Sequence, residues 1–98
     1  MAQQTTVRYT TRDVAAAEEN QRLIDAVFAD LAADRPSGLS YRVSRSDDGL
    51  GFEHVALIED GPNPLLALDS FQAFSATIGE RVVEPPQVRT ADVVARYQ

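Results

Sequence analysis

Apolar residues recur along this chain with two periods, and each period predicts one kind of element. In residues 5–10, Val7 and Tyr9 alternate with polar neighbours, which is typical of a strand. From Val14 the spacing changes to the i, i+3, i+4 pattern of an amphipathic helix, which Pro36 ends. One face of this helix carries Asn20, Leu23, Ile24, Val27, Phe28 and Leu31. The chain therefore opens with a strand and a helix.

Two further strands come next, joined by a tight turn. Residues 39–44 alternate between apolar and polar, and residues 51–59 form the partner strand. Asp48-Gly49 lies between them, where glycine accepts the positive φ that hairpin turns need. The apolar residues of the partner strand are Phe52, Ala56 and Ile58 on one side and Val55 and Leu57 on the other. Apolar residues of both parities predict that this strand is buried on both faces.

Residues 63–82 carry the pattern of a second helix. Asn63 offers a capping oxygen, and Pro64 suits the first helical position. The apolar stripe consists of Leu68, Phe71, Phe74, Ile78 and Val82. Asp69-Ser70 can restart the helix after a short first turn, so we expect a kink there.

Residues 88–97 are expected to form the last strand, after Pro85 and Pro86 have broken the helix. The element order is then β-α-β-β-α-β within one domain, residues 1–98. This order predicts an α+β, ferredoxin-like fold: a four-stranded antiparallel sheet with two helices on one face.

The face of the sheet without helices also looks apolar in the sequence. Residues 51–59 are apolar at both parities, and Val93 beside Val94 repeats this feature in the last strand. An exposed apolar patch of that extent is typical of an association surface. The sequence therefore predicts a homodimer that buries the uncovered face of the sheet.

Composition excludes several classes of partner and site. The net charge is −6, and the nine basic residues form no basic stripe, which argues against nucleic-acid binding. Cysteine is absent, which rules out disulfides and thiolate metal sites. No stretch approaches the ~20 apolar residues of a membrane span, and no signal peptide is recognisable. We expect a cytoplasmic protein without a membrane partner.

His54 is the only histidine and the first candidate for chemistry. It shares a strand parity with Phe52 and Ala56, and imidazole titrates near neutral pH, so it suits a general base in an apolar pocket. The alternative is a half-buried structural histidine with a hydrogen-bond partner. No second metal ligand accompanies it at a suitable spacing, so no metal site is expected.

Aromatic residues are the candidates for binding a ligand. Tyr9 and Tyr41 could orient an aromatic molecule beside His54, and the alternative is that both belong to the core. Phe52, Phe71 and Phe74 are candidates to line the same pocket, although such stripes mostly serve packing. No glycine-rich phosphate loop or catalytic triad is present, and no cofactor is expected.

Several short segments together carry a family resemblance. They are Phe-Glu-His-Val-Ala-Leu-Ile-Glu-Asp at 52–60, Phe-Gln-Ala-Phe at 71–74, Arg-Val at 81–82 and Pro-Pro-Gln-Val at 85–88. The chain resembles the dimeric α/β barrel superfamily, in particular small antibiotic biosynthesis monooxygenase-like proteins. The resemblance implies two ferredoxin-like protomers packed sheet against sheet, with a ligand cavity between each sheet and its helices. Some members of this superfamily oxidise polycyclic aromatics without metal or flavin.

The chain also departs from that family. Oxygenase members commonly carry a tryptophan in the strand before the second helix and often an asparagine on the first strand, and this chain has neither. Haem-degrading members place a histidine on the second helix, where none stands here.

Two functional hypotheses arise from these observations. One is a cofactor-independent monooxygenase for a small aromatic or quinol-type compound, in which His54 deprotonates a phenol and Tyr9 or Tyr41 orients it. The other is a non-catalytic homodimer with a ligand-binding or structural role. If a pocket exists, we expect His54 to border it and His54→Ala to abolish ligand retention with little effect on melting.

Overall fold

The elements of the chain have the expected order. The computed structural model describes residues 2–97. The strands are β1 (Gln3–Thr10), β2 (Leu39–Arg45), β3 (Gly51–Ile58) and β4 (Gln87–Asp92). The helices are α1 (Val14–Asp34) and α2 (Asp69–Thr77), with short 3₁₀ helices η1 (Pro64–Ala67) and η2 (Ile78–Glu80) on either side of α2.

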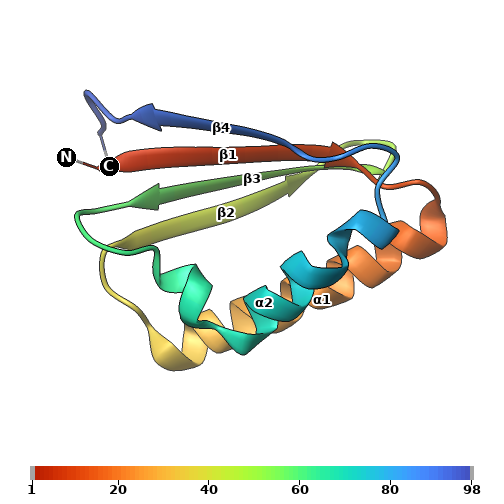
Figure 1. Cartoon of the computed structure of the whole chain (residues 1–98), viewed down its shortest axis with the longest axis horizontal. Coiled ribbons are helices and arrows are strands. Elements are labelled where there is room, and N and C mark those ends of the chain that lie inside the picture. The colour runs from red at the N-terminus through yellow and green to blue at the C-terminus, as the bar shows by residue number, and fades with distance from the viewer. Residues whose placement is uncertain (1, 98) are drawn as a thin grey trace.

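The four strands form one sheet in the order β2-β3-β1-β4, and each neighbouring pair is antiparallel. Both helices lie on the same side of this sheet, so its other face has no helix over it (Figure 1). The strand β4 pairs with β1, which brings the last strand of the chain beside the first (Figure 1). These features confirm the α+β, ferredoxin-like fold.

Helix α1 begins and ends where local chemistry dictates. The Asp13 carboxylate accepts a hydrogen bond of 2.7 Å from the backbone N–H of Ala16 and so caps the first turn. At the other end, Arg35 adopts a left-handed conformation with φ 46°, and its N–H donates to the carbonyl of Leu31. The side buried against the sheet contains Ala16, Ala17, Asn20, Ile24 and Val27.

The segment expected to be one helix from residue 63 is divided. The Asn63 side chain accepts from the backbone N–H of Leu65 at 3.0 Å and caps η1. Leu68 is extended, with φ −87° and ψ 127°, so the helix restarts at Asp69, as the Asp69-Ser70 pair indicated. α2 then tightens into η2, which ends at Glu80, ahead of the two prolines.

The last strand is shorter than expected. It ends at Asp92, so the prediction of a strand through residue 97 is wrong. All six residues of β4 are exposed, and β4 lies at the edge of the sheet. Val93 and Val94 therefore lie beyond the strand, and Val94 is 90% exposed.

The uncovered face of the sheet is less apolar than the sequence indicated. The pairing register places His54 opposite Val7 on β1 and opposite Val43 on β2. The parity of His54, which includes Phe52 and Ile58, therefore faces the helices. Only Val55 and Leu57 of β3 contribute apolar side chains to the uncovered face. Their neighbours there are mostly polar and include Gln4, Thr6, Arg8, Ser40, Arg42, Glu53 and Arg89, with Ala91 of β4 as an apolar exception.

Within residues 2–97, no helix is both long and apolar enough to cross a membrane. The cytoplasmic location stays a prediction.

The helix cap at Asp13 gives a first test of the fold. Asp13→Ala removes the acceptor for the Ala16 N–H and is expected to lower the free energy of unfolding by about 1 kcal/mol, measured by urea denaturation. Asp34→Ala is the matched control, because a carboxylate at the C-terminal end of α1 opposes the helix dipole. Its removal should leave stability unchanged or slightly higher. Equal losses from both substitutions would contradict the capping role.

Candidate functional site

An apolar cavity of about 200 Å³ lies between the sheet and the α2 segment. Its sheet wall includes Val7, Tyr41, His54 and Ala56, which come from β1, β2 and β3. Its opposite wall comes from η1, α2 and η2, where Leu65, Phe71, Phe74 and Ile78 lie. His54 and Tyr41 are the titratable residues of this sheet wall.

His54 is held between two tyrosines. The Tyr9 hydroxyl lies 2.6 Å from Nε2, and the Tyr41 hydroxyl lies 2.6 Å from Nδ1. The imidazole is only 5% exposed, and its ring lies 5.3 Å from the Phe74 ring, centroid to centroid. Both ring nitrogens therefore have a partner, which satisfies the requirement that buried polar groups be hydrogen-bonded.

The hydrogen bonds continue away from the cavity to a buried cation. Asn20 Nδ2 donates to the Tyr9 hydroxyl at 2.9 Å, and Arg81 Nε donates to Asn20 Oδ1 at 2.9 Å. The same guanidinium donates to Thr77 Oγ1 at 2.6 Å and to the Phe74 carbonyl at 3.1 Å. Asn20 is fully buried and Arg81 is 4% exposed. We call the residues Arg81, Asn20, Tyr9, His54 and Tyr41 the buried relay.

Burial sets the charge state of the buried relay. It lowers the pKa of His54 to about 4, so the imidazole is neutral at pH 7. It raises the pKa of Tyr9 to about 12, against the smaller lowering effects of Asn20 and Arg81, and it also raises the pKa of Tyr41. Burial lowers the pKa of Arg81, but a guanidinium stays protonated in proteins. Arg81 is therefore the one charged member of the relay.

The structure brings together four of the six residues that the sequence singled out. His54, Tyr41, Phe71 and Phe74 line the cavity. Tyr9 does not line it and meets the site through its hydrogen bond to His54. Phe52 does not line it either, because it stacks on Tyr9 with centroids 5.6 Å apart and packs under the Arg45 guanidinium.

Sequence reasoning missed Asn20 and Arg81 as members of the site. The sequence pattern placed Asn20 on the apolar face of α1. An amide in the middle of an apolar stripe indicates a buried polar group that needs a hydrogen-bond partner. Arg81 stands between Ile78 and Val82 at the end of the second stripe. Both were polar residues at buried positions, and such residues require partners.

One expectation about His54 needs correction. His54→Ala was expected to remove ligand retention with little effect on melting. The structure shows that the ring both lines the cavity and satisfies two tyrosine hydroxyls, which are buried or half-buried. Its removal leaves both hydroxyls without this partner, which costs stability. Tyr41→Phe is the sharper probe, because it removes a single oxygen.

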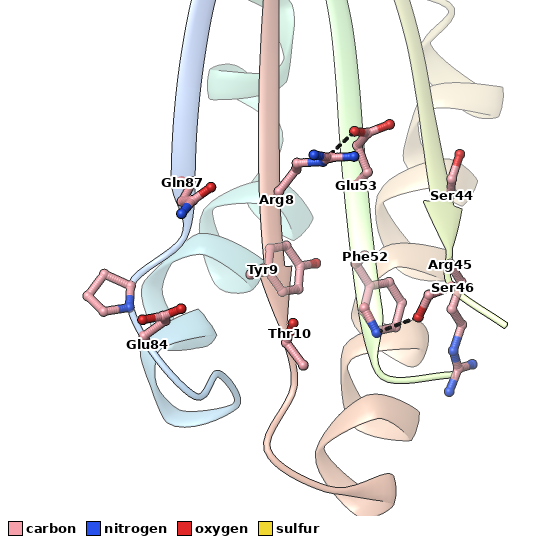
Figure 2. Close-up of a pocket in the computed structure, with 12 residues that line it drawn as sticks. Arg8, Tyr9, Thr10, Ser44, Arg45, Ser46, Phe52, Glu53, Glu84 and Gln87 are labelled. Carbon is pink, nitrogen blue, oxygen red and sulfur yellow. Dashed lines mark hydrogen bonds and ion pairs between the residues drawn. The ribbon is translucent and has the colours of Figure 1, made fainter. Parts of the chain in front are cut away.

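A second hollow, of about 470 Å³, lies open at the end of the sheet (Figure 2). Figure 2 shows Arg8 of β1 and Glu53 of β3 pointing toward each other, and they form an ion pair of 2.7 Å. Arg45, which also lines it, pairs with Glu18 of α1 at 3.0 Å. The basic groups of this hollow are thus already neutralised, so the apolar cavity beside α2 is the stronger candidate site.

Metal ligands do not gather anywhere in residues 2–97: no group of three or more His, Cys, Asp or Glu side chains could hold an ion there. The cavity wall instead offers hydroxyl, imidazole and aromatic groups, which suit an organic ligand.

Solved structures share the fold of this chain at low sequence identity. Rv0793 from Mycobacterium tuberculosis matches with a TM-score of 0.76 and 17% identity over 100% of both chains. A candidate antibiotic biosynthesis monooxygenase from Caulobacter crescentus has a TM-score of 0.71 and 19% identity, covering 96% of this chain and 91% of its own. A mutant of SnoaB, a cofactor-independent oxygenase from Streptomyces nogalater, has a TM-score of 0.70 and 14% identity, covering 97% and 95%.

No protein-family model matches the sequence, and no curated protein resembles it significantly. The likeness to solved structures concerns the fold, and at that level it confirms the resemblance to antibiotic biosynthesis monooxygenase-like proteins.

Acidification is expected to destabilise the fold through His54. The folded chain lowers the pKa of His54 to about 4, from an ordinary value of 6.5. Between these pH values the unfolded chain binds a proton that the folded chain does not. The stabilisation is therefore complete above pH 6.5 and is lost as the pH falls to about 4. The loss should be about 3 kcal/mol, at about 1.4 kcal/mol per pH unit.

Urea denaturation from about pH 7 to about pH 4 on the wild type and on His54→Gln measures this effect. Carboxylates titrate in both proteins, so the difference between their two pH profiles isolates the histidine. Parallel profiles would show that His54 is not held neutral by burial.

Proposed function

We propose that the chain is a monooxygenase-like protein that takes a small oxygenated aromatic molecule into the cavity between its sheet and α2. The observation that carries the proposal is the pair of His54 and Tyr41, hydrogen-bonded at 2.6 Å in a mostly apolar wall. An apolar cavity with a few convergent polar groups is the usual form of a small-molecule site. The reaction class rests on analogy with a cofactor-independent oxygenase of the same fold.

The size of the cavity limits the substrate. An engineered apolar cavity of about 150 Å³ holds benzene, so about 200 Å³ suits one ring or two fused rings. Phe71 and Phe74 supply aromatic surface for stacking against such rings. A naphthol therefore fits better than a three-ring anthrone.

The proposed reaction needs only the substrate and oxygen. 1-Naphthol releases its hydroxyl proton to water, which places negative charge on the ring carbon opposite the oxygen. O₂ adds at that carbon, and the resulting peroxide takes up a proton from water to give a hydroperoxide. Loss of water then yields 1,4-naphthoquinone, so one oxygen atom enters the product and the other leaves as water. The substrate supplies all the electrons. Tyr41 would hold the substrate oxygen and stabilise its negative charge as a hydrogen-bond donor.

The non-catalytic alternative also has a specific observation in its favour. Both nitrogens of His54 already have tyrosine partners, and burial lowers its pKa to about 4. Such an imidazole is a weak base, and neither of its nitrogens is free to take a proton directly from a substrate. A protein that binds an aromatic molecule without converting it would show the same cavity.

Oxygen consumption with 1-naphthol tests the proposed function. The wild type is expected to consume oxygen and form naphthoquinone, and Tyr41→Phe should lower the rate about a hundredfold, as loss of one oxyanion donor does elsewhere. Tyr97→Phe is the matched control, because Tyr97 is fully exposed and should leave the rate unchanged. Binding without oxygen consumption would support the non-catalytic alternative. The absence of both binding and consumption would refute the monooxygenase and leave only a structural role for the homodimer.

A homodimer is part of the same proposal. Val55 and Leu57 form the apolar centre of the uncovered sheet face, and arginines on the neighbouring strands surround them. An apolar centre within a polar, arginine-containing rim is typical of protein interfaces. A second copy of the chain is the proposed partner for this face.

Light scattering tests the dimer. The wild type is expected at twice the 10.7 kDa mass of one chain, and Leu57→Arg should give the single-chain mass by placing an unpaired charge in the interface. Leu66→Arg is the control, since Leu66 is an exposed leucine of η1 on the helical side. A wild type at the single-chain mass, or equal behaviour of the two variants, would exclude this interface.

A further inference from the structure

We infer that the cavity binds its ligand through an oxygen that accepts a hydrogen bond from Tyr41. Arg81 and Asn20 are the positioning residues, because they determine which atom donates and which accepts in each hydrogen bond of the buried relay. The inference names the ligand class of the proposed site and rests on the proposed function for the place of binding. Its basis is the direction of each hydrogen bond in the buried relay, taken in turn from Arg81.

Arg81 fixes the first direction because a guanidinium has five N–H donors and no acceptor. Its Nε lies 2.9 Å from the side chain of Asn20, so the Asn20 atom that faces Arg81 must be the carbonyl oxygen. The remaining bonds to Thr77 and to the Phe74 carbonyl hold the guanidinium in this orientation. Asn20 therefore turns its NH₂ group toward Tyr9.

Asn20 determines the next two directions. Its Nδ2 donates to the Tyr9 hydroxyl at 2.9 Å, so the Tyr9 oxygen acts as the acceptor in that bond. Tyr9 keeps its own hydrogen at neutral pH, since burial raises its pKa to about 12. The other partner in reach is His54 Nε2 at 2.6 Å, and Tyr9 donates to it.

The tautomer of His54 determines how the Tyr41 hydroxyl is hydrogen-bonded at the cavity. A neutral imidazole carries one hydrogen, and Nε2 already accepts, so the hydrogen lies on Nδ1. Nδ1 then donates to the Tyr41 oxygen at 2.6 Å. The Tyr41 hydroxyl hydrogen is left without an acceptor among the residues that the structure describes, and Tyr41 lines the cavity. Tyr41 is thus the hydrogen-bond donor that the relay presents to the cavity, whose lining also includes Thr5, Asn63 and Ser75.

A ligand that matches this wall carries a carbonyl, quinone or phenolate oxygen on an apolar ring system. A ligand whose polar group can only donate would leave two hydrogens facing each other. The opposite relay, with Nε2 protonated, would leave the buried Tyr9 hydrogen without an acceptor, which costs free energy. The structure therefore favours one imidazole tautomer over the other.

Nitrogen-15 NMR of His54 tests the relay directly, because the chain has a single histidine and hence one pair of imidazole signals. In the wild type at neutral pH, the hydrogen is expected on Nδ1. A hydrogen on Nε2, or on both nitrogens, would overturn the inference.

Asn20→Asp should reverse the relay. The carboxylate replaces the donor by an acceptor and stays paired with Arg81, so Tyr9 donates to it and accepts from Nε2–H instead. The hydrogen of His54 is then expected on Nε2, and Tyr41 donates to Nδ1. Gln21→Glu makes the same amide-to-carboxylate change on α1, outside the relay and the cavity lining, and should leave the tautomer unchanged. An unchanged tautomer in folded Asn20→Asp would overturn the positioning role.

Ligand binding gives the second measurement. Indane and 1-indanone differ by one carbonyl oxygen, and calorimetry should show indanone binding the wild type about fivefold more tightly, as one neutral hydrogen bond allows. Tyr41→Phe and Asn20→Asp should abolish this preference and leave indane binding unchanged. No preference in the wild type, or binding of neither molecule, would overturn the inference. If indanone binds as expected but the wild type consumes no oxygen with 1-naphthol, the proposed reaction is wrong and the inference about ligand binding stands.

Discussion

The structure depends on one constraint: a buried guanidinium must be surrounded by acceptors. Arg81 comes directly after η2, and its donors reach Asn20 on α1, Thr77 on α2 and the Phe74 carbonyl. An unpaired charge in this position would cost several kcal/mol, on the order of what a small domain has in total stability. The contact between Arg81 and Asn20, separated by 61 positions in the sequence, therefore ties the two helices together across their shared face.

The same burial that fixes Arg81 also defines the chemistry of the cavity. Away from water, the imidazole of His54 stays neutral and both tyrosines keep their hydrogens, since burial shifts each pKa away from its charged form. Hydrogen bonds are also stronger in this environment, because nearby water does not compete for the donors. The oriented Tyr41 hydroxyl in a mostly apolar wall can then distinguish an oxygenated ring from a hydrocarbon, which the packing of Phe71 and Phe74 cannot do.

Periodicity in the sequence predicted the elements, whereas features that depend on strand register and helix packing were missed. Alternation and turn chemistry located all four strands, and Asn63-Pro64 with Asp69-Ser70 located the start and restart of the second helical segment. The length of β4 was wrong, because Val93 and Val94 fit a strand pattern but lie past the last paired residues. The apolar character of the uncovered face was overestimated, because parity within one strand does not say which face the helices cover. Asn20 and Arg81 could be seen as buried polar residues, but their contact depends on how α1 packs beside η2.

The pairing register of the sheet explains why the site lies where it does. Tyr41, His54 and Tyr9 come from β2, β3 and β1, which are neighbours in the sheet. His54 stands opposite Val43 and Val7, so each tyrosine is its diagonal neighbour, two residues along the adjacent strand. Diagonal neighbours with side chains of this length come within hydrogen-bond reach on one face of a sheet. A slip of β3 by one residue would turn His54 to the uncovered face and bring Val55 against the helices. The apolar pattern that holds β3 in place therefore also holds the imidazole between its two tyrosines, and the stability of the fold and the geometry of the site share one cause.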